Sequence, residues 1–327
     1  MIIKAPIDLK LTQNSGQTSQ PPWKLDNNIY SDVVVADNKA VLFQVKQKEN
    51  NLDFNFIGDL SNNEATKKIK TIFDLDFNLN KFYKYLNNQP ELADMTNFCR
   101  DLRLFLAKDK FECVISSVCS ANNSIARWTK SIDDIKKSWG NKYTYSEKDY
   151  FTFPDVSDFK NIYCDDVEEF ECCSNLNNPG ECINNLKSCG VGYRAPYMKK
   201  ASEIFTLEMD LDDISKMSYD EAFDTILKVP GVGPKVADCI LLYGFNFRQA
   251  FPTDVWIKRI VSYLYFDGKD INVSKIREFG MEEFGDYAGY VQLYLFHYAR
   301  MSGLMKKLKG MWYYENKVCY NYCRGYG

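Results

Sequence analysis

The sequence predicts an α+β fold, with an N-terminal antiparallel β-sheet domain over residues 1–92 and a helical domain over residues 93–327. The first indication is LDFNFIG, in which apolar and polar residues alternate as in a half-buried strand. The second is a change near residue 91, after which apolar residues recur at helical spacing. The third is length, because 327 residues with 45% hydrophobic composition suffice for two or three domains.

Three strands and two helices are expected in the first domain. The strands are placed at 32–36, 40–46 and 52–58, and Asp37-Asn38-Lys39 forms the turn between the first two. Helical patterns follow near 63–73 and 79–87. This order favours an antiparallel sheet.

The second domain is expected to be helical, with one irregular insertion. Residues 150–185 lack a clear period and combine turn residues with a cluster of acidic side chains, which is typical of a surface insertion. No internal repeat is apparent in the sequence. Helical patterns occupy 91–107, 110–140, 197–207, 219–228, 235–245, 254–266 and 286–300.

Composition limits where the chain works and what it binds. The sequence has no run of about 18 apolar residues, and its start, MIIKAPIDLK, lacks a basic segment followed by an apolar one. We therefore expect an intracellular protein, in the cytoplasm or nucleoid of a prokaryote or the nucleus of a eukaryote, that is neither membrane-bound nor secreted. The net charge of −3 argues neither for nor against nucleic-acid binding, because acidity gathers in the insertion and a basic run lies at Lys306, Lys307 and Lys309.

The eleven cysteines form no recognisable disulfide framework. Three of them, Cys113, Cys119 and Cys239, lie in apolar helical segments where a buried free thiol is the ordinary interpretation. We expect reduced thiols, and a metal or redox site built from the middle group is the alternative. That middle group is Cys164, Cys172, Cys173, Cys182 and Cys189.

The most informative pattern lies within residues 219–260, where two amphipathic helices flank the turn VPGVGP (229–234). One proline ends the first helix and the other suits the first turn of the second. Such a turn exposes backbone N–H groups at a helix N-terminus, where they can bind a phosphate. A plain connector between helices is the alternative. The candidate phosphate-binding residues are Gly231, Val232 and Gly233.

Lys235 opens the second helix and is the candidate nucleophile. A lysine becomes nucleophilic when burial or positive potential, such as that of a helix N-terminus, lowers its pKa. Cys239, at i+4, places a thiol on the same helix face. Asp254 begins another helical run, where it serves as an N-cap, as a carboxylate that assists Lys235, or as both. A solvated lysine and an ordinary cap are the alternatives.

Five segments in a fixed order carry a resemblance to a known family. They are SGQTSQPPW (15–23), CSANNSIAR (119–127), GVGYRAPY (190–197), LKVPGVGPKVADC with FPTDV, and FGDYAGYVQLYLF (284–296). Together they resemble the helix-hairpin-helix glycosylase superfamily, and within it the 8-oxoguanine DNA glycosylases. The resemblance covers nearly the whole chain and implies an all-α helix-hairpin-helix glycosylase domain after the sheet. It also implies a bifunctional DNA glycosylase and apurinic-site lyase.

The resemblance implies a role for each matching residue. Lys235 would attack the sugar C1′ and form a Schiff base that permits β-elimination, and Asp254 would assist loss of the base. Gly16 would offer its carbonyl oxygen to the N7 hydrogen of the oxidised guanine. Gln292 would bond the edge of the base, while Cys239 and Phe296 would sandwich its ring.

The partner strand has its own set of implied residues. Tyr193 would wedge into the duplex, and Asn122, Arg127 and Arg194 would hold the orphaned cytosine, which would offset the cost of flipping a base. The expected partner is double-stranded DNA containing oxidised guanine, bound by a monomer. No cofactor or metal is required, although a monovalent or divalent cation held by hairpin carbonyls and a DNA phosphate fits the resemblance.

The chain departs from well-known members of this family at several positions. Trp256 stands where they carry a histidine, and Ala299 stands where they carry the aspartate that pairs with it. These changes put a phosphate contact from that position in doubt. The only histidine, His297, lies elsewhere, and Ser124 replaces a third asparagine.

Three other functions compete with this interpretation. Glycosylases of the superfamily that act on oxidised pyrimidines or mispaired adenine often carry four closely spaced cysteines, but only Cys319 and Cys323 follow Cys239 here. A non-catalytic DNA-binding module would need the hairpin but not Lys235 and Asp254. A cysteine-based metal or redox protein would contain stoichiometric metal.

Overall fold

The computed structural model describes residues 1–36, 39–164 and 184–304, which fall into two compact units. Unit 1 comprises Met1–Asn78 and Asp101–Ala250, and unit 2 comprises Leu79–Arg100 and Phe251–Gly327. Several sequence features lie outside the described residues: Asp37 and Asn38, the acidic cluster from Asp165 onward, Cys172, Cys173, Cys182, Cys319, Cys323, and the basic run Lys306, Lys307 and Lys309.

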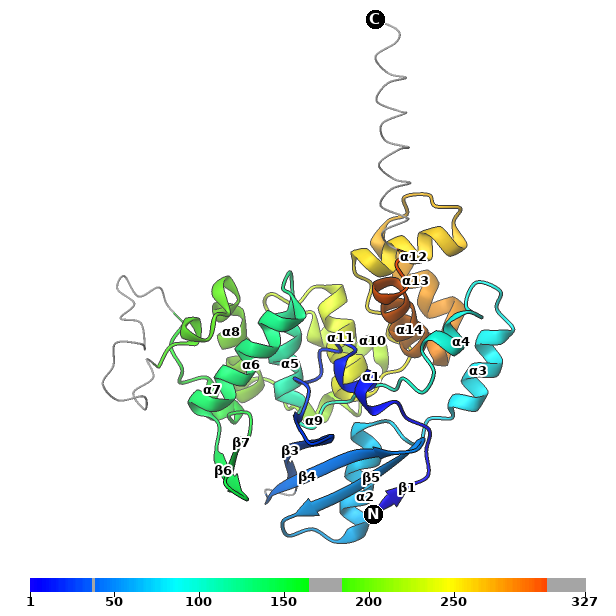
Figure 1. Ribbon diagram of the computed structural model, residues 1–327. Coiled ribbons are helices and arrows are strands. Elements are labelled where there is room, and N and C mark those ends of the chain that lie inside the picture. Colours follow the sequence, from blue (N-terminus) through cyan, green and yellow to red (C-terminus); the bar gives the residue numbers. More distant parts are fainter. Residues whose placement is uncertain (37–38, 165–183, 305–327) are drawn as a thin grey trace, which may run out of the picture. The chain divides into compact units, whose positions relative to one another are not determined.

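Unit 1 contains the predicted antiparallel sheet, with five strands in the order β1-β5-β4-β3-β2 (Figure 1). Alternation of apolar residues along the strands gives the sheet two different faces, because successive side chains point to opposite sides. The N-terminal sheet and the α+β class are therefore confirmed. The strands are β1 (Ile2–Ile3), β2 (Lys24–Asp26), β3 (Ile29–Ala36), β4 (Lys39–Lys48) and β5 (Asn51–Ile57).

Both faces of the sheet are covered within unit 1. On one face, Val41, Phe43 and Val45 of β4 join a core with Ile69 and Ile72, which lie on helix α2 (Asn62–Ile72). A second cluster holds Val33, Leu42 and Tyr150 and lies on the opposite face. Tyr150 belongs to a hairpin of β6 (Lys142–Tyr145) and β7 (Lys148–Phe151), which the sequence did not predict.

The remaining elements of unit 1 are mostly helices. The helical pattern over 110–140 forms two helices, α5 and α6, because residues 121–124 form a break at which Asn122 adopts a φ of +50°. The helices are α1 (Leu9–Asn14), α5 (Lys110–Ser120), α6 (Ile125–Trp139), α7 (Val156–Phe159), α8 (Ala195–Leu207), α9 (Leu211–Ile214), α10 (Tyr219–Ile226) and α11 (Pro234–Phe245), with 3-10 turns η2 (Leu186–Cys189) and η3 (Gly192–Arg194).

The prediction of a helix over residues 91–107 is wrong for residues 102–107. Only α4 (Met95–Phe98) forms, and residues 102–107 run as a non-helical segment through the core of unit 1. The reason is that this backbone bonds to other parts of the unit. The amide of Leu106 donates to Ile72 and that of Ala107 donates to Tyr243, at 2.8 Å in each case.

Unit 2 is helical, and aromatic rings fill its core. Phe82 lies 5.4 Å from Tyr290, measured between ring centroids, and Phe251 lies 5.7 Å from Phe284. One of its helices, α13, was not predicted from the sequence. The elements are α3 (Leu79–Asn87), α4, α12 (Val255–Tyr265), α13 (Val273–Phe284), the 3-10 turn η4 (Gly285–Tyr287) and α14 (Ala288–Met301).

Among the described residues, no helix has both the length and the apolar character that a membrane span requires.

Candidate active site

The predicted hairpin joins α10 to α11 in unit 1. Gly231 is exposed and has a φ of +81°, a left-handed conformation that favours glycine. Gly233 is extended, with φ −97° and ψ 177°, and caps α11 with Pro234 at its first position. The turn is closed by the amide of Val232, which donates to the carbonyl oxygen of Val229 at 3.1 Å. The N-terminus of α11 therefore presents backbone N–H groups, which makes it a candidate anion site.

A tyrosine from α8 packs directly on this turn. A Cβ atom on Gly231 would lie 2.5 Å from Cγ of Tyr197 and 2.8 Å from its Cβ. The ring therefore occupies the space that any side chain at residue 231 would need. Tyr197 stands four positions after Tyr193, so one exposed face of this segment carries two aromatic side chains.

Lys235 and Cys239 lie one turn apart on α11, as predicted. Lys235 is partly buried, whereas the Cys239 side chain is buried. Burial raises the pKa of the Cys239 thiol above its ordinary value, although the nearby charge of Lys235 and hydrogen bonds from Thr18 and Lys235 act in the opposite direction. Thr18 is in turn 3.0 Å from Ser117, measured between hydroxyl oxygens. The Lys235 amine therefore lies beside the neutral thiol of Cys239, and the hydroxyl groups of Thr18 and Ser117 continue this series of polar groups within unit 1.

The segment that carries Gly16 is anchored to unit 1 by buried glutamines. Gly16 itself has a φ of +86°. Its neighbour Gln17 donates from Nε2 to the carbonyl oxygen of Arg103 at 3.0 Å and accepts from the amide of Phe105 at 2.8 Å. Gln20 donates to the carbonyl oxygen of Leu106 at 2.8 Å. The non-helical segment 102–107 therefore provides the backbone partners that hold the Gly16 carbonyl in place.

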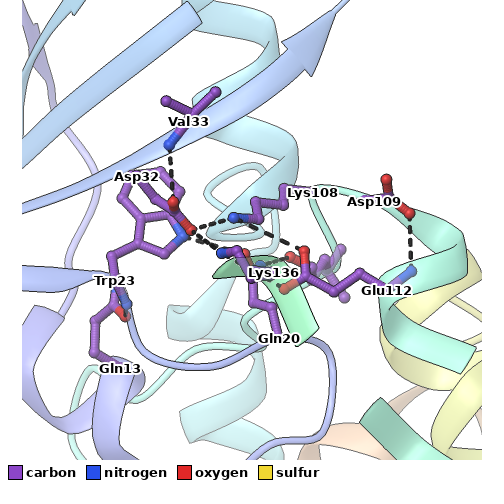
Figure 2. Close-up of polar contacts among 10 residues, drawn as sticks. Gln13, Gln20, Trp23, Asp32, Val33, Lys108, Asp109, Glu112 and Lys136 are labelled. Carbon is purple, nitrogen blue, oxygen red and sulfur yellow. Dashed lines mark hydrogen bonds and ion pairs between the residues drawn. The ribbon is translucent and has the colours of Figure 1, made fainter. Parts of the chain in front are cut away.

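Charged groups buried in unit 1 connect the sheet to α5 and α6 (Figure 2). Asp32 of β3 accepts bonds from the ammonium groups of Lys108 and Lys136, the latter at 3.3 Å. Both ammonium groups also lie 3.8 Å from Glu112 carboxylate oxygens. Burial alone would raise the pKa of Asp32, but the two lysines hold it below its ordinary value; burial raises the pKa of Glu112. The cluster anchors the two helices on either side of the Asn122 turn.

The residues predicted to face the partner strand gather around that turn. Asn122 and Arg127 are exposed, at the break before α6 and on its first turn. Tyr193 is 58% exposed, so its ring is available to a duplex. Arg194 is different, because its side chain is buried and its guanidinium donates to the carbonyl oxygens of Ala121 and Asn122.

Asp254 lies in unit 2, where it is the N-cap of α12. Its Oδ1 accepts from the amides of Trp256 at 2.9 Å and Ile257 at 2.8 Å. The predicted capping role is therefore confirmed. Asp254 itself is partly exposed at the surface of unit 2.

Gln292 and Phe296 share one face of α14, as their spacing predicts. The Nε2 atom of Gln292 donates to the carbonyl oxygen of Pro252 at 3.0 Å, which points the amide toward the start of α12. Its buried Oε1 has no hydrogen-bond partner in the part of the chain that the structure describes. Phe296 is half-buried, and the guanidinium of Arg300 lies 5.3 Å from its ring centroid.

The residues at which the chain departs from the family pattern differ in their burial within unit 2. Ala299 is buried in the core, Trp256 is partly exposed, and His297 packs against the ring of Phe98. Arg300 carries a charge that interacts with Asp254, while burial lowers the pKa of its guanidinium. The positive group of Arg300 therefore interacts with both Phe296 and Asp254.

Sequence reasoning missed three side chains that shape the candidate site. Thr18 and Tyr197 belong to segments that carried the resemblance, yet nothing in their spacing marked them. Arg300 follows Phe296 by four positions, which is the one signal that could have identified it. In residues 1–36, 39–164 and 184–304, no group of three or more His, Cys, Asp or Glu side chains could hold a metal ion.

A hollow elsewhere in unit 1 contains none of the predicted site residues. It lies between the sheet and the β6–β7 hairpin, and its lining includes Lys24, Leu42, Tyr145 and Tyr150. Its lysines are engaged, since Lys148 pairs with Asp26 at 2.5 Å. The candidate chemistry thus lies in α11 and in the α12–α14 region, not in this hollow.

Comparisons with known proteins identify the family of the chain. Residues 1–114 match the family model for the N-terminal domain of 8-oxoguanine DNA glycosylase, and residues 115–285 match that of the HhH-GPD superfamily of base excision DNA repair proteins. A probable N-glycosylase/DNA lyase of Methanothermobacter thermautotrophicus is 43% identical over 92% of this chain and 96% of its own length. The N-glycosylase/DNA lyase of Saccharomyces cerevisiae is 26% identical over 90% of this chain and 84% of its own.

A solved structure extends the likeness to three dimensions. The 8-oxoguanine glycosylase/lyase of Clostridium acetobutylicum, in complex with double-stranded DNA containing cytosine opposite 8-oxoguanine, is 28% identical. The alignment covers 93% of this chain and 98% of that one, with a TM-score of 0.74. The chain therefore belongs to the 8-oxoguanine DNA glycosylase family, within the HhH-GPD superfamily of base excision DNA repair proteins.

Proposed function

We propose that this protein excises 8-oxoguanine from duplex DNA, preferring cytosine as the opposite base, and that it does so through a Schiff base on Lys235. The chain is a bifunctional DNA glycosylase and lyase of the 8-oxoguanine type, as its relatives are named. The observation that carries the proposal is the arrangement on α11, where Lys235 lies beside the buried Cys239 immediately after the VPGVGP turn.

In the proposed reaction, the amine of Lys235 attacks the sugar C1′ as the bond to the base breaks; the base leaves with the bonding electron pair and is protonated, and the attacking nitrogen loses a proton. Asp254 assists departure of the base by stabilising positive charge that develops on the sugar. The C1′–O4′ bond of this adduct then breaks, O4′ takes up a proton as the sugar ring opens, and an iminium between Lys235 and C1′ results. The iminium acidifies the hydrogens on C2′, so that loss of one of them expels the 3′ phosphate and cleaves the strand by β-elimination. Cys239 remains a neutral thiol, which suits a group that packs against the ring of a base.

Base recognition would be divided between a backbone carbonyl oxygen and two side chains of α14. The Gly16 carbonyl, which the glutamine bonds hold, would accept the N7 hydrogen that only the oxidised base carries. Gln292 would use its unpartnered Oε1 toward the edge of the base, and Phe296 would stack on the ring.

The partner strand and the backbone would engage other surfaces of the chain. Gly231, Val232 and Gly233 would bind a phosphate through their amides, together with a cation held by the hairpin carbonyls. Tyr193 would enter the gap in the duplex, while Asn122, Arg127 and Arg194 would hold the side of the orphaned cytosine. We propose that one copy of the chain suffices for this binding.

The experiment is a base-release assay under single-turnover conditions, with duplexes that contain 8-oxoguanine opposite each of the four bases. We expect release of 8-oxoguanine, fastest opposite cytosine, and no comparable release of ordinary guanine. Release of oxidised pyrimidines or mispaired adenine without release of 8-oxoguanine would contradict the proposed specificity.

A further inference from the structure

Arg300 lies on the same side of α14 as two residues of the candidate base pocket. Gln292, Phe296 and Arg300 follow one another at intervals of four positions, so their side chains lie along one side of the helix. The amide of Gln292 donates to the carbonyl oxygen of Pro252 at 3.0 Å, which places this side of α14 against the segment that leads into α12. Asp254 is the last residue of that segment, where it caps the helix.

The guanidinium of Arg300 contacts an aromatic ring and interacts with a carboxylate. Arg300 is partly buried, and its guanidinium carbon lies 5.3 Å from the ring centroid of Phe296. Burial lowers the pKa of the guanidinium, and the charge of Asp254 acts in the opposite direction. An arginine nevertheless keeps its proton at neutral pH. A positive charge therefore acts on the carboxylate that caps α12.

The charges that come from α12 itself are arranged differently. Lys258 lies one turn after Asp254, and its ammonium group pairs with Asp270 at 2.6 Å. The N-terminus of α12 contributes partial positive charge through the amides that bond Oδ1 of Asp254. Arg300 supplies Asp254 with a full positive charge from a second helix, α14.

A carboxylate that assists loss of a base has to lie next to the sugar, and this position carries an electrostatic cost. The sugar is flanked by a phosphate on each side, so a carboxylate placed there repels the backbone that the protein has to bind. Salt screens this repulsion less inside a closed interface than at an open surface. A neighbouring guanidinium offsets the repulsion and still leaves the carboxylate charged for chemistry.

We propose that Arg300 is the counter-ion of Asp254, which offsets the repulsion between this carboxylate and the DNA phosphates that flank the reacting sugar. The inference rests on the proposed function, from which it takes the position of Asp254 beside the sugar, and it deepens that function. Arg300 acts through Asp254 and is therefore a positioning residue, with the ring of Phe296 supporting its guanidinium. Two other roles compete: a direct contact to a phosphate, and a structural contact of a cation with the C-terminal turn of α14.

A double-mutant cycle on duplex affinity separates these roles. The probe is a duplex with a tetrahydrofuran analogue of an abasic site opposite cytosine, because it keeps the flanking phosphates and has no base to lose. We expect Arg300→Met to raise the Kd about tenfold in the wild-type background, but less than about threefold in Asp254→Asn, where no carboxylate remains to be offset. Asp254→Asn alone should bind this duplex at least as tightly as the wild type.

Arg300→Lys tests whether charge is the property that matters. It keeps a positive group but not the planar guanidinium, so its Kd should stay within about threefold of the wild type. Lys275→Met is the matched control, because it removes an exposed cation of α13 in unit 2 and should change the Kd by the same small factor in both backgrounds. If denaturant unfolding shows that Arg300→Met lacks a stable fold, Arg300→Gln takes its place in the cycle.

An equal rise in the Kd in both backgrounds would overturn the inference, since a direct phosphate contact and a structural role both act without Asp254. Unchanged affinity of Arg300→Met in the wild-type background would overturn it too, as would Arg300→Lys that binds as weakly as Arg300→Met. These measurements require no excision of a base. Failure of the wild type to release 8-oxoguanine would contradict the proposed function, while the affinities still decide whether Arg300 and Asp254 act as a pair at the DNA.

Discussion

Gly231 and Tyr197 are packed so closely that the ring of the tyrosine fills the space a side chain at residue 231 would occupy. The contact joins α8 to the hairpin turn within unit 1, although the two residues are far apart in sequence. It leaves no room for a side chain at residue 231 and packs the predicted phosphate-binding turn against Tyr197. The conformation of this turn therefore depends on a residue outside the hairpin.

Replacement of Gly231 by alanine should weaken both the fold and binding to DNA. The new Cβ would collide with Tyr197, and φ at this position is +81°, so a cost of about 1–3 kcal/mol in the free energy of unfolding is expected. Denaturant unfolding and titration with undamaged duplex measure the two effects.

Gly233→Ala provides the matched control for the cost in stability. Its φ is −97° and a Cβ there would meet nothing within 4 Å, so the free energy of unfolding should hardly change. Equal destabilisation by the two substitutions would show that the contact with Tyr197 does not matter. Tyr197→Ala combined with Gly231→Ala should recover part of the loss, because it removes the collision but leaves the strained φ.

The buried charges around Asp32 should respond in opposite ways to two neutralising substitutions. Asp32→Asn removes the carboxylate that accepts hydrogen bonds from Lys108 and Lys136 and should cost about 3–5 kcal/mol in the free energy of unfolding. Glu112→Gln should be neutral or stabilising at pH 7, because burial disfavours the charged form of this carboxyl. The exposed Asp59, paired with Lys39, is the control, and Asp59→Asn should leave stability unchanged.

The pH dependence follows from the directions of the two pKa shifts. The lowered pKa of Asp32 means that its contribution to stability is present above the ordinary aspartate pKa, about 3.9, and is lost as pH falls through the folded-state value. The raised pKa of Glu112 has the opposite sign, since the folded state favours its protonated form and loses stability as pH rises through the ordinary glutamate range. Glu112→Gln should therefore remove a fall in stability between acid and neutral pH. An unchanged pH profile would contradict this assignment.

Asp254→Asn should separate capping from chemistry. Asparagine caps a helix nearly as well as aspartate, so α12 should keep its bonds to Trp256 and Ile257, and stability should change by less than about 0.5 kcal/mol. Loss of the carboxylate should nevertheless lower single-turnover base release by about 100-fold or more. Asp254→Ala should lose base release in the same way and should also lower the free energy of unfolding by about 1 kcal/mol, because alanine cannot cap α12. Normal base release by Asp254→Asn would remove this residue from the mechanism.

Gln17→Ala should reduce the selectivity for 8-oxoguanine over guanine. It removes the partners of the Phe105 amide and the Arg103 carbonyl, which costs about 1–3 kcal/mol and loosens the segment that carries Gly16. Gln47→Ala is a matched control, because Gln47 also accepts a backbone N–H, from Leu9 at 2.9 Å, but does not hold that segment. The ratio of the two release rates should fall for Gln17→Ala only; an equal fall in both variants would point to general loss of stability.

Local patterns predicted the elements that depend on local contacts. The strands β3, β4 and β5 and helices such as α2, α3 and α11 appear where periodicity placed them, whereas the short edge strands β1 and β2 were not predicted. By contrast, residues 102–107 have enough apolar side chains for a helix, yet their backbone bonds to Gln17, Ile72 and Tyr243, which no local pattern reveals. Tertiary bonds thus outweighed helical propensity.

Most residues of the candidate site were predicted from the family resemblance, and few of them from residue type and spacing alone. The spacing of Lys235 and Cys239 puts both on one face of α11, and the structure agrees. The contacts of Arg194 and Tyr197 could not be predicted, since each links segments that are distant in sequence. The proposed cooperation of Lys235 with Asp254 remains a prediction.

The most direct test of the central claim is borohydride trapping with a duplex that carries 8-oxoguanine opposite cytosine. The account predicts a covalent protein–DNA adduct for the wild type and none for Lys235→Gln, which should still bind the duplex. Reduction of the iminium would make the linkage permanent, and peptide mapping should locate it at Lys235. A wild type that binds the duplex tightly yet forms no adduct, or an adduct that persists in Lys235→Gln, would contradict the claim.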